Sequence, residues 1–257
     1  MNYAPPSLRG LALDRDVSFA KSAYRKALKI ERAYAVNLRK IARHIADLVR
    51  GFDLTQPLSL EYLRDALERY ADILGPWAES TATRMVKEAA SHDEKSWRAI
   101  SAKIGKALEI EIATAPTGQA MRSLINQQVG LITSLPREAA ERVHTLVQEG
   151  MLVGQRPATL AKKILETGEV TKARANLIAR TETARAAATL KQVRAQSIGS
   201  VGYIWKTTGD SDVRPSHRAM RGQFVRWDDP PTLDGMIGHA GCLPNCRCRA
   251  SPVLPKD

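Results

Sequence analysis

The sequence predicts an α+β protein, with a mostly helical region at residues 1–135 followed by a compact α+β domain at residues 136–257. The composition favours helix, because aromatic residues make up only 5% of the 257 residues and Ala, Leu, Arg and Lys are abundant. Apolar residues repeat at helical spacing as far as about Ser197. Beyond Gly199 the pattern changes to short alternating runs between clustered prolines and glycines.

The first two helices follow from stripes of apolar residues three and four positions apart. One helix runs from about Asp16 to Arg50 and ends before Gly51, and the next begins near Ser59 after Pro57 and ends before Gly75-Pro76. The stripe residues are Tyr34, Leu38, Ile41, Ile45 and Leu48 in the first helix, and Leu60, Leu63, Leu67, Tyr70 and Leu74 in the second.

Further helices follow after the Gly-Pro break. Asp93 is predicted to begin a helix that carries Trp97, since an aspartate can accept hydrogen bonds from the free amides of a first turn. Pro116 is predicted to end that helix, and Pro136 to open another that stops near Gly150. A short helix between Gly154 and Gly168 should turn Leu160, Ile164 and Leu165 inward, and an Ala-rich helix should run from Thr171 to about Ser197.

Two short strands are expected in the last sixty residues. Val201, Tyr203 and Trp205 alternate with Gly202 and Ile204, and a second β-prone run contains Phe224, Val225 and Trp227. Trp205 and Trp227 are expected in the core rather than as stacking platforms for bases. Everything beyond Asp210 is rich in turn residues.

The formal net charge of +12 predicts attraction to a polyanion. Nucleic acid, contacted without sequence specificity, and a negatively charged protein surface both fit that charge. The sequence contains no apolar run of membrane-spanning length and no secretory leader, so we expect a protein that stays in the cytoplasm where it is made.

All three cysteines lie within seven residues, in the run Cys242-Leu-Pro-Asn-Cys246-Arg-Cys248. On an extended segment, residues two apart point the same way, so Cys246 and Cys248 deliver two thiolates to one point while Arg247 faces away. A turn at Pro244-Asn245 would fold Cys242 towards that pair. These thiolates are ligands that zinc prefers. Reduced cysteines packed in a small core are the alternative.

A tetrahedral zinc requires a fourth ligand, for which the sequence offers His217 and His239. His239 is only three residues from Cys242, whereas His217 lies on a different turn and could lock two segments together, so we prefer His217 and keep His239 as the alternative. A site of three cysteines and one histidine is closed and structural, because protein ligands fill all four positions.

Five blocks of sequence, in order, resemble the phage Mu F-like head morphogenesis domain. They are Ala-Arg180-Thr181-Glu182-Thr183, Gly202-Tyr-Ile-Trp-Lys-Thr207, Asp212-Val-Arg214-Pro-Ser-His217, Arg221-Gly-Gln223 and Asn245-Cys-Arg-Cys248. The resemblance covers residues 137–253. It implies a minor capsid protein of a tailed bacteriophage, a non-enzymatic component of the virion that takes part in procapsid assembly and in DNA packaging or delivery. The implied partners are the portal protein and the major capsid or scaffold protein.

The polar residues of these blocks form a predicted structural motif of Arg180, Glu182, Asp212 and Arg214. We expect Arg180 to pair with Glu182 or to reach the loop that carries Asp210 and Asp212. A catalytic Glu182 is the alternative, since domains of this family sometimes precede toxin modules. Nine residues follow Cys248, and we expect no such module. A zinc-containing enzyme or a protein that binds phage DNA stays open as the other functional hypothesis.

Overall fold

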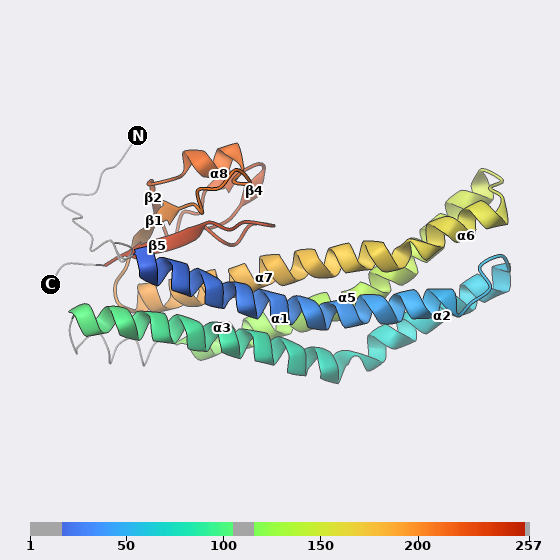
Figure 1. Cartoon of the computed structure of the whole chain (residues 1–257), viewed down its shortest axis with the longest axis horizontal. Helices are drawn as coiled ribbons and strands as arrows, with labels where there is room; N and C mark the ends of the chain where they lie inside the picture. Colours follow the sequence, from blue (N-terminus) through green and yellow to red (C-terminus); the bar gives the residue numbers. More distant parts are fainter. Residues whose placement is uncertain (1–16, 105–115, 255–257) are drawn as a thin grey trace. The chain divides into compact units, whose positions relative to one another are not determined.

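The structure, a computed structural model, describes residues 17–104 and 116–254 (Figure 1). The chain divides into two compact units. Unit 1 consists of residues 1–30, 86–124 and 181–257, and unit 2 consists of residues 31–85 and 125–180. The predicted division into residues 1–135 and 136–257 remains a prediction, and its border lies inside a continuous helix.

The helices are α1 (Val17–Arg50), α2 (Pro57–Ile73), α3 (Gly75–Ile104), α5 (Thr117–Leu152), α6 (Pro157–Leu165), α7 (Thr167–Ser197) and α8 (Pro215–Ala219). The strands are β1 (Gly202–Lys206), β2 (Phe224–Arg226), β3 (Thr232–Leu233), β4 (Met236–Ile237) and β5 (Arg249–Val253). The predicted fold class is therefore confirmed: the chain is mostly helical and has a small sheet region near its C-terminal end. In the described part of the chain, no helix combines the length and the apolar character needed to cross a membrane.

Unit 2 is helical, and its core consists of the apolar stripes that the sequence indicates. Leu38, Ile45, Leu63 and Leu67 are completely buried. Gln128 is also buried, and its side-chain oxygen accepts a hydrogen bond of 3.0 Å from the hydroxyl of Tyr34. Leu165 was predicted to face inward, but it is exposed, because Leu160 and Ile164 four residues apart already fill the buried face of α6.

Two predicted helix starts are wrong. Asp93 lies inside α3, where its carboxylate accepts a hydrogen bond of 2.8 Å from Nε of Arg194 on α7, and both side chains are buried within unit 1. Burial raises the pKa of Asp93 to about 6, against the opposing effects of Lys191 and Arg194. A buried ion pair therefore holds the residue that the sequence suggested as a helix cap.

Pro136 lies inside α5 instead of opening a helix. A proline removes one backbone hydrogen bond of a helix, but packing on both sides of this position keeps the helix continuous. Leu135 and Ala139 are buried. The hydroxyls of Thr133 and Ser134 donate to the backbone carbonyls of Val129 and Leu131, both at 3.0 Å, in the turn before the proline.

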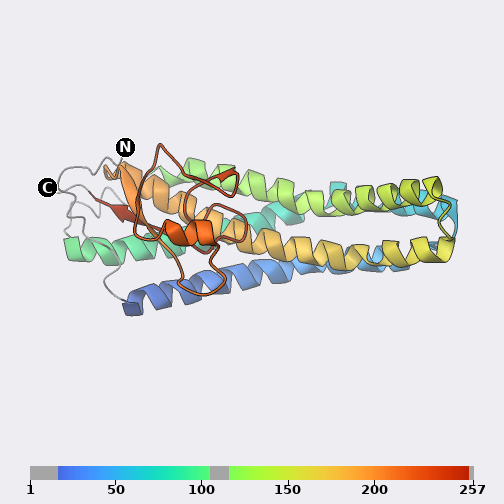
Figure 2. The same cartoon turned by 90° about the horizontal axis from the view of Figure 1, so that it is seen from above.

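The sheet of unit 1 has the strand order β2-β1-β5 and is antiparallel throughout. Gly202 of β1 lies opposite Arg226 and Val253, and Lys206 at the other end of β1 lies opposite Arg249. Tyr203 and Trp205 of β1 are completely buried, and Trp97 and Trp227 belong to the same core, which confirms the predicted core positions of Trp205 and Trp227. In Figure 2 the segment that follows β1 lies over the C-terminal part of α7.

Candidate metal centre

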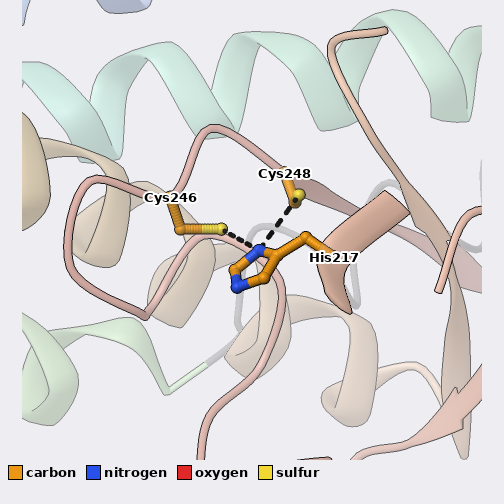
Figure 3. Close-up of side chains that lie close together, drawn as sticks. All are labelled: His217, Cys246 and Cys248. Atoms are coloured by element: carbon orange, nitrogen blue, oxygen red, sulfur yellow. Dashed lines mark hydrogen bonds between the residues drawn. The ribbon is translucent and has the colours of Figure 1, made fainter. Parts of the chain in front are cut away.

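The side chains of His217, Cys246 and Cys248 form one buried group in unit 1 (Figure 3). His217 belongs to α8, a short helix that begins at Pro215, where the fixed φ of proline suits a first helical position. The two cysteines lie in the segment that leads into β5, and Arg247 between them points away from the group, as predicted. The potential ligand atoms of His217, Cys246 and Cys248 all lie within 4.8 Å of one another.

The geometry of this group fits a tetrahedral metal. Nδ1 of His217 is 3.4 Å from Sγ of Cys246 and 3.6 Å from Sγ of Cys248. Zinc–sulfur bonds of about 2.3 Å and zinc–nitrogen bonds of about 2.0–2.1 Å at a tetrahedral angle place sulfur and nitrogen about 3.6 Å apart. The two nitrogen–sulfur distances are therefore close to those that one shared ion would impose, and nitrogen with two sulfurs is a soft donor set.

The two thiols are electrostatically unequal. A hydrogen bond from Cys248 lowers the pKa of Cys246 to about 5, against the opposing effect of burial, and the backbone amides of Cys248 and Gly241 also lower it. The same hydrogen bond, together with burial, raises the pKa of Cys248. A doubly charged cation bound by both sulfurs would favour the deprotonated form of each thiol.

Packing fixes the orientation of the His217 ring. Trp205 lies edge-on to it, with ring centroids 5.8 Å apart and an interplanar angle of 82°. Nδ1 of His217 faces the sulfurs, and Nε2 on the other side of the ring is buried without a hydrogen-bond partner among the described residues. The Trp205 indole opposes the effects of Cys246 and of burial on the pKa of Cys248, but that pKa is still raised.

Two further predicted ligands lie outside the group of three. Cys242 is half-buried, and burial raises the pKa of its thiol to about 11. Nδ1 of His239 is 3.3 Å from the hydroxyl of Tyr203, and its ring packs edge-on against Tyr203 and Trp227. His239 is therefore engaged in the aromatic core of the sheet, whereas Cys242 belongs to the same loop as the paired cysteines.

Polar side chains around the centre hold its loop. Arg185 donates from Nε and Nη2 to the carbonyl of Cys242, at 3.3 and 3.1 Å, and its Nη1 forms an ion pair of 3.0 Å with buried Glu182. Nη2 of Arg214 donates to the carbonyl of Pro244 at 2.7 Å. The hydroxyl of Thr181 accepts a hydrogen bond of 3.1 Å from the backbone amide of Asn245.

The predicted contacts of Arg180 need correction. Arg180 forms an ion pair of 3.7 Å with Glu31 in unit 2, and Glu182 pairs with Arg185 three residues along α7. The residue that reaches Asp210 and Asp212 is Arg247, at 3.0 Å from each carboxylate. Arg247 takes this place because the alternation that turns the two cysteines inward turns its side chain outward, towards that loop.

Sequence reasoning missed the roles of Thr181 and Arg185. Thr181 belongs to a block that the resemblance singled out, but nothing in its spacing shows that Asn245 lies opposite. Asn245 itself carries a signal, because an asparagine after a proline favours a turn, and its φ of 55° is in the left-handed region. A turn of this kind exposes backbone amides that other side chains must satisfy.

Unit 1 is thus an α+β domain with a small sheet and a buried group of metal-ligand side chains. A family model described as "Phage Mu protein F like protein" matches residues 141–251, and this stretch contains α7, the sheet up to Ser251, α8 and the candidate centre. Residues 141–251 are therefore similar to Phage Mu protein F-like proteins, which confirms the resemblance recognised in the sequence.

One curated protein is similar to this chain. An uncharacterized protein of Haemophilus influenzae is 30% identical over 216 residues, which are 82% of this chain and 46% of the relative. The chain thus spans about half the length of the relative that it matches. No solved structure matches the chain.

Proposed function

We propose that this protein is a minor head protein of a tailed bacteriophage, with a structural role in procapsid assembly and in DNA packaging or delivery. The observation that carries the proposal is the match of residues 141–251 to the Phage Mu protein F family. That stretch includes each of the five blocks on which the resemblance rests. Under this proposal the protein resides in the virion, inside or lining the head, and in the host cytoplasm during assembly.

The proposal makes the protein a structural component rather than an enzyme. Two observations support this. His217 and Cys246 are only 2% and 3% exposed, so a metal bound there would have no open side for a substrate. Glu182, the candidate for a catalytic carboxylate, is 4% exposed and pairs with the arginine that holds the Cys242 carbonyl, which is a structural task.

The same proposal includes a structural zinc ion held by His217, Cys246 and Cys248, with Cys242 as the fourth ligand. Cys242 is preferred over His239, because it belongs to the same loop as Cys246, whereas His239 is packed against Tyr203 and Trp227. The ion would connect α8 to the segment before β5. Because the loops around it contain few large apolar residues, metal binding would contribute directly to folding.

The proposed partners are the portal protein and the major capsid or scaffold protein. The net charge of +12 supports contact with acidic protein surfaces and non-specific contact with packaged DNA.

Deletion of the gene from the phage genome, followed by complementation with this chain, tests the proposal. We expect the deletion to reduce the yield of filled heads in electron micrographs, and the chain supplied from a plasmid to restore it. Heads that assemble and fill equally well without the gene would contradict the structural role. A deletion that leaves heads intact but stops DNA replication would favour an enzyme or a protein of DNA metabolism.

A further inference from the structure

The loop from Gly241 to Cys246 is attached to α7 and α8 by its backbone. Side chains bind it at the carbonyl of Cys242, the carbonyl of Pro244 and the amide of Asn245. Two of these contacts come from a single turn of α7, where Thr181 and Arg185 are four residues apart and therefore lie on the same face. Three of the four proposed zinc ligands lie in this loop or directly after it.

The contact by Arg185 is itself supported. Its guanidinium binds the Cys242 carbonyl with two nitrogens and uses a third for the ion pair with Glu182, whose side chain is 6% exposed. A buried carboxylate without its partner is costly, so Glu182 favours the one position of Arg185 that also reaches the loop. The three side chains Thr181, Glu182 and Arg185 form what we call the α7 clamp.

The loop approaches α7 closely at Gly241, whose φ is +90°. A Cβ atom added there would stand 3.3 Å from Cβ of Ala188 and 3.1 Å from the carbonyl oxygen of Cys248. Asn245 also has a positive φ, which costs free energy for a residue other than glycine. The hydrogen bond from its amide to Thr181 offsets part of that cost.

We infer that the α7 clamp is a positioning device for the metal centre, which holds the cysteine loop in the metal-binding conformation before the ion arrives. This inference rests on the zinc centre proposed above. A loop that is already ordered loses less conformational entropy when it binds an ion, so its affinity is higher. Residues that orient metal ligands typically change metal affinity by about 10- to 100-fold when they are replaced.

Two threonines of α7 provide a matched test. Thr181 and Thr183 are both buried, but the hydroxyl of Thr181 accepts the Asn245 amide, whereas that of Thr183 has no partner among the described residues. Valine has the shape of threonine without the hydroxyl. We expect Thr181→Val to weaken binding of Co²⁺, used as a spectroscopic substitute for zinc, by about tenfold. Thr183→Val should change it less than twofold, and Thr181→Ser should restore it.

Titration of the metal-free full chain with Co²⁺, followed by its sulfur-to-cobalt absorption band, measures these affinities. Equal affinities for the two valine variants would overturn the clamp. A wild-type chain that gives no such band would overturn the zinc centre itself, which is a separate result.

If Thr181→Val does not fold, Arg185→Lys replaces it, with Arg174→Lys as control. Arg174 lies on the same helix as Arg185, has a similar exposure and pairs with Glu138 of α5. A loss of affinity confined to Arg185→Lys supports the clamp, and equal affinities contradict it.

Discussion

His217 of α8 faces Cys246 and Cys248, which lie 29 and 31 residues further along the chain. Nδ1 of its ring faces the sulfurs of both cysteines, and the ring also makes an edge-on contact with Trp205. A metal ion at this position would bind all three side chains, His217, Cys246 and Cys248. With Cys242 as the proposed fourth ligand, such an ion would be structural, because protein ligands would fill all four of its positions.

Replacing Cys246 and Cys248 together by serine should remove the proposed zinc and loosen unit 1. Three of the four tryptophans, Trp97, Trp205 and Trp227, belong to the core of that unit. We expect the near-ultraviolet circular dichroism to fall strongly, while the helical signal in the far ultraviolet is largely kept, because unit 2 has its own core.

Elemental analysis of the purified wild type should find stoichiometric zinc. The variant His239→Gln should keep the zinc, because His239 lies in the aromatic core instead of the group of ligands. A wild-type protein without zinc that nevertheless gives the full near-ultraviolet signal would contradict the proposed structural zinc.

Much of the candidate site could be predicted at this scale. Two cysteines one residue apart must point the same way on an extended segment, and His217 lies on a different turn, so all three were found from spacing and chain position. The hydrogen bonds of Thr181 and Arg185 could not be found, because they join α7 to a loop about sixty residues away and depend on how the two pack. Arg180 was given a role that Arg247 performs, for the same reason.

For the helices, tertiary packing determines the boundaries at two positions where the local sequence signals predict a different result. Asp93 has the properties of a helix cap, and Pro136 those of a helix start, but both lie inside helices whose neighbouring residues are buried. Strand β5 contains Ser251 and Pro252 and has no clear alternating pattern, and it forms because β1 offers it a full edge. The β3–β4 hairpin did carry a strong signal, since Asp234-Gly235 is a preferred two-residue turn and both residues have positive φ.

Alanine substitutions at Gly241 and Gly209 distinguish the strain of a left-handed backbone from the effect of close packing between the loop and α7. Gly241 and Gly209 both have left-handed φ values, of +90° and +82°, but a Cβ at Gly209 would meet nothing within 4 Å. Alanine should therefore cost the same conformational strain at both positions, and at Gly241 about 1 kcal/mol more, because of the contacts with Cys248 and Ala188.

Urea unfolding of Gly241→Ala and Gly209→Ala measures this difference in the free energy of unfolding. The metal affinity should also fall only for Gly241→Ala. Equal destabilisation at the two positions would mean that the close approach of the loop to α7 contributes nothing.

For the whole molecule, the sequence predicted the fold class and the family, because helical periodicity and ordered motif blocks are properties of the chain itself. The border at residues 135 and 136 was placed at a proline, whereas the two compact units are each assembled from separated segments and share the helices α1, α3, α5 and α7. Such a division arises from contacts between distant residues, and composition along the chain does not reveal it.

We propose that the protein is a structural part of a phage head. The most direct test is quantitative mass spectrometry of heads purified by sedimentation from cells that express the chain together with the portal, coat and scaffold proteins of its own phage. We expect the chain to sediment with the heads in a small, constant ratio to the portal protein, and this ratio to survive a high-salt wash. A chain found wholly in the supernatant, with heads of normal composition, would contradict it.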